Sequence, residues 1–123
     1  MRKRILTVSG KIRKLERRRA RILEELLVPE PLLKGGLSLV MRTCGKPNCH
    51  CAKKPGHPVW VFTGRRGAAR RSQVVRQADV ERVQERVATY RQFRAAIREL
   101  EAIGKEEKQL LKGLIDNRNE PYE

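Results

Sequence analysis

The sequence contains few aromatic residues and no long apolar segment. Aromatic residues make up 4% of the 123 residues and hydrophobic residues 39%. The apolar side chains are mostly leucine, valine, isoleucine and alanine, which favours packed helices over an all-β sandwich. A membrane-spanning helix needs about 20 apolar residues and a signal peptide an apolar stretch of roughly 7–15, whereas the run after Arg4 covers only residues 5–8. We therefore expect a soluble, cytoplasmic protein without a membrane partner.

Acidic residues are missing from a long central segment. No Asp or Glu lies between Pro31 and Asp79, and the chain contains no P-loop, nucleophile elbow or paired-carboxylate motif. A catalytic metal needs an open coordination position and a nearby general acid or base. A metal-dependent nuclease or other enzyme is therefore the least favoured interpretation, and we expect no catalytic residues.

Positive charge dominates the chain and is concentrated in its first part. Lys and Arg number 29 against 14 Asp and Glu, which gives a formal net charge of +15. Residues 1–76 hold 20 of these basic residues and only 4 acidic ones. A domain this positive repels itself and attracts a polyanion. Nucleic acid is the usual partner, and an anionic membrane is the alternative.

Two helices are predicted from apolar residues that recur at intervals of three or four. The first spans residues 9–27, with Ser9 as its N-cap and Pro29 just beyond its end. The second spans residues 79–115, with Asp79 as its N-cap. Its apolar stripe is too long to be buried on a small sheet. We expect the first helix to cover part of it, and a second copy of the chain or a partner protein to cover the rest as in a coiled coil.

Between the helices the sequence predicts a small antiparallel sheet, so the fold class is α+β. Strands are expected at residues 37–43, 59–63 and 69–76, with a Gly-Arg-Arg-Gly hairpin turn at residues 64–67. A sheet of two or three strands is marginal alone and needs a helix or a metal to hold it. The predicted regions are an N-terminal basic helix and linker (1–34), a zinc knuckle with the small sheet (35–78), and a long C-terminal helix with a polar tail (79–123).

Three cysteines lie within eight residues of one another, which favours a metal site over a disulfide framework. With one histidine they have the spacing C-x4-C-x-C-x5-H, and the predicted ligands are Cys44, Cys49, Cys51 and His57. Three thiolates and one imidazole suit one closed, structural Zn²⁺ site. His50 is an alternative fourth ligand, although it lies between two ligating cysteines, where its ring most easily points away. An iron–sulfur cluster and unmetallated or redox-active thiols are the competing interpretations.

Basic residues cluster on the first predicted helix and on the predicted hairpin, with lysines of the cysteine segment between them. Arginine suits phosphate because its planar fork donates two parallel hydrogen bonds. Trp60 alternates with Phe62 and is expected in the core rather than stacked on a base. The pattern does not distinguish DNA from RNA. The candidate nucleic-acid contacts are Lys11, Arg13, Lys14, Arg17, Arg18, Arg21, Lys46, Lys53, Lys54, Arg65, Arg66, Arg70, Arg71 and Arg76.

The segment from Leu39 to Ala52, followed by Gly-His-Pro at residues 56–58 and an aromatic strand at Trp60, resembles an uncharacterised family of short proteins. Members occur in bacteria, archaea and phages, often near transposase or integrase genes. The order of parts is also similar, ending in a long helix with a Tyr-Arg-x-Phe-Arg segment, here residues 90–94. The resemblance covers about residues 36–100. The family typically has Gly-His-Gly-Pro-Tyr where this chain has Gly-His-Pro-Val-Trp, so the loop here is one residue shorter.

Because that family has no settled activity, the resemblance implies the zinc site and a bacterial, archaeal or phage source more than it implies a function. Together with the charge pattern, it predicts a small zinc protein that binds nucleic acid as an accessory or regulatory factor of a mobile genetic element. The alternative is a protein-interaction subunit of a larger nucleoprotein or enzyme complex, docking through residues 79–115.

Overall fold

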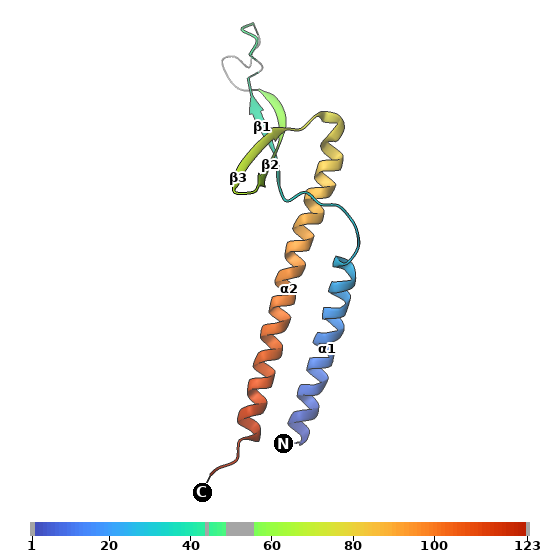
Figure 1. Cartoon of the computed structure of the whole chain (residues 1–123), viewed down its shortest axis with the longest axis vertical. Coiled ribbons are helices and arrows are strands. Elements are labelled where there is room, and N and C mark those ends of the chain that lie inside the picture. Colours follow the sequence, from blue (N-terminus) through green and yellow to red (C-terminus); the bar gives the residue numbers. More distant parts are fainter. Residues whose placement is uncertain (1, 44, 49–55, 123) are drawn as a thin grey trace. The chain divides into compact units, whose positions relative to one another are not determined.

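The computed structural model describes residues 2–43, 45–48 and 56–122. The elements follow in the order α1 (Arg2–Leu26), β1 (Gly35–Arg42), β2 (His57–Arg66), β3 (Ala69–Val74), a 3-10 helix η2 (Gln77–Asp79) and α2 (Val80–Arg118) (Figure 1). The predicted α+β class, with a helix at each end and an antiparallel sheet between, is confirmed, and the sheet has three strands. The chain divides into two compact units, Met1–Pro29 with Phe93–Glu123 and Glu30–Gln92, which are described separately below.

The first unit is a pair of helices, formed by α1 and the part of α2 from Phe93 onward. Helix α1 begins at Arg2, so the predicted start and the Ser9 N-cap are wrong. The reason lies in the buried residues Val8, Leu15 and Ile22, which are spaced seven apart. Residues spaced in this way form one apolar stripe along the helix, and the stripe begins before Ser9 and Gly10. Packing of the stripe outweighs the weak helix propensity of those two residues.

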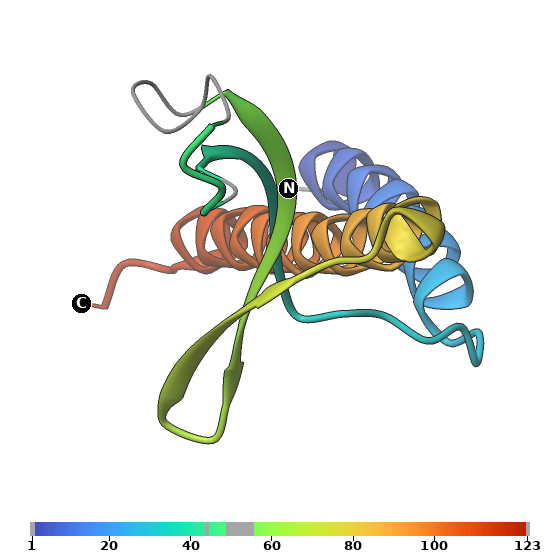
Figure 2. The ribbon, with the colours of Figure 1, turned by 90° about the horizontal axis from the view of Figure 1, so that it is seen from above.

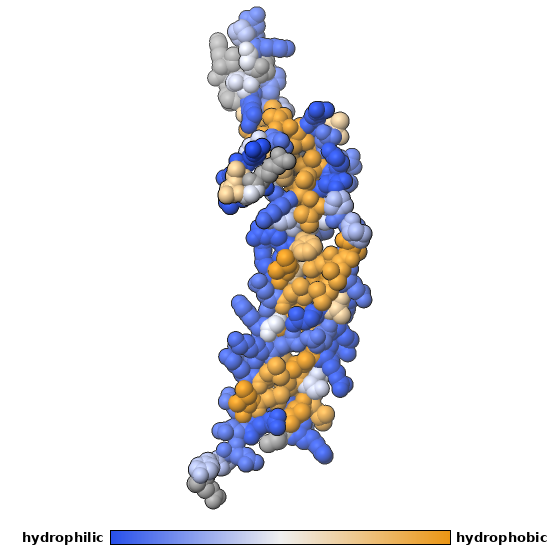
Figure 3. Space-filling view, viewed as in Figure 1, coloured by the Kyte–Doolittle hydropathy of each residue, from blue (hydrophilic) through white to orange (hydrophobic). Residues whose placement is uncertain are grey.

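The core of the helix pair joins the two helices face to face. Leu15 and Ile22 of α1 form a buried cluster with Ile103 of α2, and four partly buried residues pack around it: Leu26, Ala96, Leu100 and Leu110. The helices are antiparallel, with the start of α1 beside the end of α2 (Figure 1). This confirms that the first helix covers part of the long apolar stripe. Apolar side chains gather along the helix pair between hydrophilic flanks (Figure 3).

Ion pairs flank this core. Arg18 donates to Glu99 at 2.8 Å, and Arg19 donates to Glu16 at 3.3 Å and also to Glu107 of α2. Arg19 interrupts the apolar stripe of α1 in the sequence, and its pairing with Glu107 across the two helices explains why a charge is tolerated there. A hydrogen bond with Glu16 and then the one from Arg19 lower the pKa of Glu107 below its ordinary value.

The second unit is built on a sheet in the order β1-β2-β3, with both strand pairs antiparallel. Strand β2 is longer than predicted, and the hairpin turn lies after Arg66, not at residues 64–67, because Arg66 pairs with Ala69. Gly67 has a φ of +64°, the left-handed conformation that a two-residue hairpin turn requires. Figure 2 shows the β2–β3 hairpin as a twisted ribbon closed by this turn.

Two glycines allow a close approach between β1 and β2. Gly35 and Gly64 are directly paired in the register. A Cβ atom on Gly35 would lie 2.3 Å from the Thr63 carbonyl oxygen and 2.8 Å from the Phe62 ring, and one on Gly64 would lie 2.9 Å from the same ring. Only glycine therefore fits at both positions, and the Phe62 ring packs directly on the backbone.

The first turns of α2 belong to the same unit as the sheet. Val80, Val83 and Val87 are buried at helical spacing, which confirms the start of the predicted stripe. The backbone N–H of Leu33 donates to the Arg86 carbonyl at 3.1 Å, so the segment before β1 is tied to α2. Asp79 lies immediately before α2 as the last residue of η2. No helix in the described part of the chain has an apolar stretch long enough to cross a membrane.

Ile103 offers a test of the helix-pair core. Its side chain is 2% exposed, whereas that of Ile97, on the same helix, is 43% exposed. We expect Ile103→Ala to lower the free energy of unfolding by about 2–5 kcal/mol, because it leaves a cavity, and Ile97→Ala to change it by about 0.5 kcal/mol or less. Urea unfolding followed by circular dichroism measures both. Equal effects of the two substitutions would contradict this packing.

Candidate nucleic-acid interface and metal ligands

One of the four predicted zinc ligands lies within the described residues. His57 is the first residue of β2 and is half-buried. Cys44, Cys49 and Cys51 lie outside the described residues, as do the alternative ligand His50 and the lysines at 53 and 54. Among the residues that the structure does describe, no group of three or more His, Cys, Asp or Glu side chains is placed to hold a metal ion.

The strand register brings the two ends of the cysteine segment together. Arg42, the last residue of β1, is paired with His57, the first residue of β2, so the residues that flank the cysteine segment on either side are held next to each other. Gly45 has a φ of +79°, a left-handed conformation that fits the tight chain reversal expected beside the first cysteine. The histidine is therefore anchored on a strand next to the start of the loop that carries the cysteines.

The basic residues of the hairpin are divided between the two faces of the sheet. Thr63 and Ser72 are cross-strand partners, and their hydroxyl oxygens lie 3.1 Å apart in a hydrogen bond, which shows that both point to one face. Side chains alternate along a strand, so Arg65 and its direct partner Arg70 lie on that same face. Arg71 follows Arg70 and lies on the opposite face.

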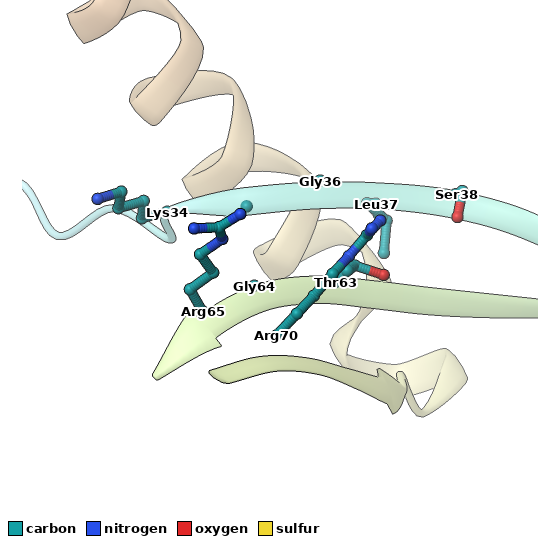
Figure 4. A pocket seen from close by; sticks show the side chains of 9 residues that line it. Lys34, Gly36, Leu37, Ser38, Thr63, Gly64, Arg65 and Arg70 are labelled. Atoms are coloured by element: carbon teal, nitrogen blue, oxygen red, sulfur yellow. The ribbon is translucent and has the colours of Figure 1, made fainter. Parts of the chain in front are cut away.

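A pocket of about 440 Å³ opens on the face of the arginine pair. Three basic residues line it from three separate segments: Lys34 before β1, Arg65 on β2 and Arg70 on β3. In Figure 4 the side chains of Arg65 and Arg70 extend from their strands toward β1. The remaining lining residues are Gly35, Gly36, Leu37, Ser38, Thr63 and Gly64. We call this cavity the Gly36 pocket.

Lys34 was missed by sequence reasoning. It stands alone before Gly35 in the chain, and its proximity to the hairpin arginines follows from the pairing of Gly35 with Gly64. That register depends on a close approach of two backbones, which composition and periodicity do not encode. The signal available in the sequence was the Gly35-Gly36 pair directly after a lysine.

The predicted contacts of α1 belong to the other compact unit. Six of them are exposed on this helix: Lys11, Arg13, Lys14, Arg17, Arg18 and Arg21. Arg18 already has Glu99 as a partner. Among the remaining predicted contacts, Lys46 and Arg76 are also exposed, in the cysteine loop and after β3. Each of the two compact units thus exposes basic residues, on α1 in one and on the sheet in the other.

Comparison with known proteins places this chain in a family. A family model described as a domain of unknown function, DUF6788, matches residues 12–85, which is more than half of the chain. The chain belongs to this family. The DUF6788 match takes in most of α1, the cysteine loop, the whole sheet and the start of α2. No curated protein and no solved structure matches the sequence. The expected resemblance to an uncharacterised family is confirmed at this level, while its zinc motif and gene neighbourhood stay predictions.

Proposed function

We propose that this DUF6788 protein is a non-catalytic module that binds nucleic acid through its basic sheet and α1. The observation that carries the proposal is the direct pairing of Arg65 with Arg70 within a segment that contains no carboxylate. Residues 31–78 contain ten Lys or Arg and no Asp or Glu. The accessory or regulatory role in a mobile genetic element is part of the same proposal and rests on the resemblance alone.

The electrostatics of the sheet favour an external anion. Like charges directly opposite each other on neighbouring strands are destabilising. The ion pairs that Arg18, Arg19 and Arg82 make with carboxylates lie outside the sheet, on α1, α2 and η2. The phosphate backbone of a nucleic acid would relieve the repulsion between Arg65 and Arg70. Release of counterions from the nucleic acid would strengthen the binding further.

A structural zinc ion fits the loop that closes the other end of the sheet. Its ligands in this proposal are Cys44, Cys49, Cys51 and His57. The pairing of Arg42 with His57 supports the geometry, because it brings the imidazole to the start of the cysteine loop. Bound zinc would supply a crosslink between β1 and β2 in a sheet that has only three strands and a modest core.

The zinc site is tested by two single substitutions. We expect the purified wild-type protein to hold about one zinc ion per chain, as a Cys₃His site does. His57→Ala should lose the ion during dialysis, because one of four ligands is removed, and His50→Ala should keep it. Elemental analysis measures the metal content. Zinc retained by His57→Ala but lost by His50→Ala would assign the fourth ligand to His50, and a wild-type protein without zinc would end the proposal.

The nucleic-acid surface is tested by replacing the four hairpin arginines at 65, 66, 70 and 71 with alanine. We expect binding of a labelled duplex to weaken by at least about tenfold at 0.1 M salt, and the slope of log K against log salt to become less steep by about 0.9 for each lost phosphate contact. Gel-shift or fluorescence titration over a salt series measures both quantities.

The matched control removes four positive charges from exposed positions of α2: Arg91, Arg98, Lys105 and Lys108. We expect this control to keep most of the affinity, because residues 77–123 are nearly neutral and carry acidic neighbours. Equal losses in the two variants would show that only net charge matters and would reject the hairpin as the contact.

A second function is favoured by one observation on the helix pair. Leu111 and Ile115 of α2 are 52% and 69% exposed, and Leu6 of α1 is also exposed. Apolar side chains in this position suit a partner helix, which agrees with a protein-interaction subunit or a homodimer. Sedimentation of the purified protein at micromolar concentration, together with co-purification of a fixed partner free of nucleic acid, distinguishes this role from that of a lone nucleic-acid module.

A further inference from the structure

The Gly36 pocket is one of two cavities of the sheet lined by basic side chains, and it is the one lined by the directly paired Arg65 and Arg70. Three basic residues line it from different segments, and three of its other lining residues are glycines: Gly35, Gly36 and Gly64. A Cβ atom built on Gly36 meets no heavy atom within 4 Å, so the space above this residue is open.

We propose that the Gly36 pocket binds one phosphodiester group of a nucleic-acid backbone, held between Lys34, Arg65 and Arg70. This inference rests on the proposed function and assigns it a defined contact point. It also divides the hairpin arginines into two groups. Arg65 and Arg70 bind phosphate in the pocket, whereas Arg71, on the opposite face, does not.

The chemistry of the lining suits an oxyanion. Arg65 and Arg70 stand directly opposite each other in the register, so an anion between them removes the repulsion that the pair otherwise carries. Thr63 and Ser38 add hydroxyl groups to the wall of the pocket. Guanidinium and hydroxyl groups are common hydrogen-bond donors to phosphate oxygens. The glycines among the lining residues let a ligand approach the backbone without meeting a side chain.

The opposite face of the sheet offers a different environment. On that face the Phe62 ring packs on Gly35 and Gly64 and covers their backbone. A cavity of about 350 Å³ on that side is lined by Phe62, Leu33, Gln73 and Arg71, together with Lys34, Gly64 and Arg65. Three basic residues line this cavity as well, but its two arginines are not direct partners in the register, because Arg71 pairs with Gly64 and Arg65 pairs with Arg70.

A lipid headgroup carries the same phosphate chemistry, but the surface favours nucleic acid. Binding to a membrane surface needs exposed apolar side chains on the same side as the basic ones. The exposed apolar side chains of β1 are Leu39 and Met41, at 52% and 50%. Alternation from Gly36 and Ser38 puts both of them on the face opposite the arginine pair. Val74 of β3, at 60%, lies on the arginine face, two residues beyond Ser72, but one exposed valine is a small apolar contribution for a membrane surface.

Adjacent arginines on opposite faces make a matched test, since Arg70→Ala and Arg71→Ala remove the same charge one residue apart. Full-length, zinc-loaded protein is titrated with a labelled 20-nucleotide duplex and with the single strand at several salt concentrations. We expect Arg70→Ala to weaken binding about eightfold at 0.1 M salt. Each phosphate contact contributes about −0.9 to the slope of log K against log salt concentration, and 0.1 M is one decade below 1 M. The slope of log K against log salt concentration should become less steep by about 1 in this variant. Arg71→Ala should stay within about twofold.

A third variant fills the pocket without changing charge. Gly36→Val adds a β-branched side chain that suits a strand, and its Cβ meets no neighbour. We expect it to bind as weakly as Arg70→Ala while its circular dichroism spectrum and melting temperature match the wild type. Gly36→Ala, with one carbon, provides a smaller step if valine disturbs the strand.

The outcomes separate the two proposals. Equal losses for Arg70→Ala and Arg71→Ala, or full affinity in well-folded Gly36→Val and Gly36→Ala, overturn the pocket while nucleic-acid binding by the wild type stands. A wild-type protein that binds neither oligonucleotide overturns the proposed function itself. Tighter binding to phosphatidylserine vesicles than to either oligonucleotide, with the same order of variants, assigns the pocket to a lipid phosphate and overturns the nucleic-acid assignment.

Discussion

The repulsion between Arg65 and Arg70 is the constraint on which the account of the sheet depends. The antiparallel register fixes these two residues as direct partners, and the segment around them supplies no carboxylate to separate them. The repulsion between the two arginines destabilises the free protein, and binding of an anion between them offsets that cost in free energy. The zinc crosslink proposed at the other end of β2 acts on the other strand pair, where it would hold β1 and β2 together.

The two compact units handle their charge in different ways. In the helix pair, Arg18 and Arg19 find carboxylates on the facing helix, at Glu99 and Glu107. These pairs are internal to the helix pair and flank its core, which is centred on Ile103. In the sheet segment, by contrast, no Asp or Glu lies between Pro31 and Asp79. We infer that the sheet holds phosphate at a defined pocket, while the exposed basic face of α1 adds further contacts and α2 offers an apolar face to a protein partner.

Periodicity predicted the helices, the strands and their order because the spacing of apolar residues indicates which side chains will be buried. This spacing can be read from a short stretch of sequence. The errors came from non-local effects. Helix α1 begins at Arg2 because packing against α2 stabilises turns that weak helix formers would not start alone. The hairpin turn lies at Gly67 and not at Gly64, because Gly64 is needed opposite Gly35 under the Phe62 ring. The Gly36 pocket depends on that register, so its lining could not be assembled from the sequence. The zinc ligands were predicted from spacing alone, and of these the structure describes only His57.

Hydrogen exchange of the full-length protein, with and without a saturating duplex oligonucleotide, tests the central claim most directly. The account predicts slower exchange of backbone amides around the Gly36 pocket, at residues 35–38 and 63–72, because bound phosphate covers the backbone and holds the paired arginines together. It predicts unchanged exchange in the buried turns of α2 around Ile103. Unchanged exchange across both strand segments, in a sample shown to be fully bound, would contradict it.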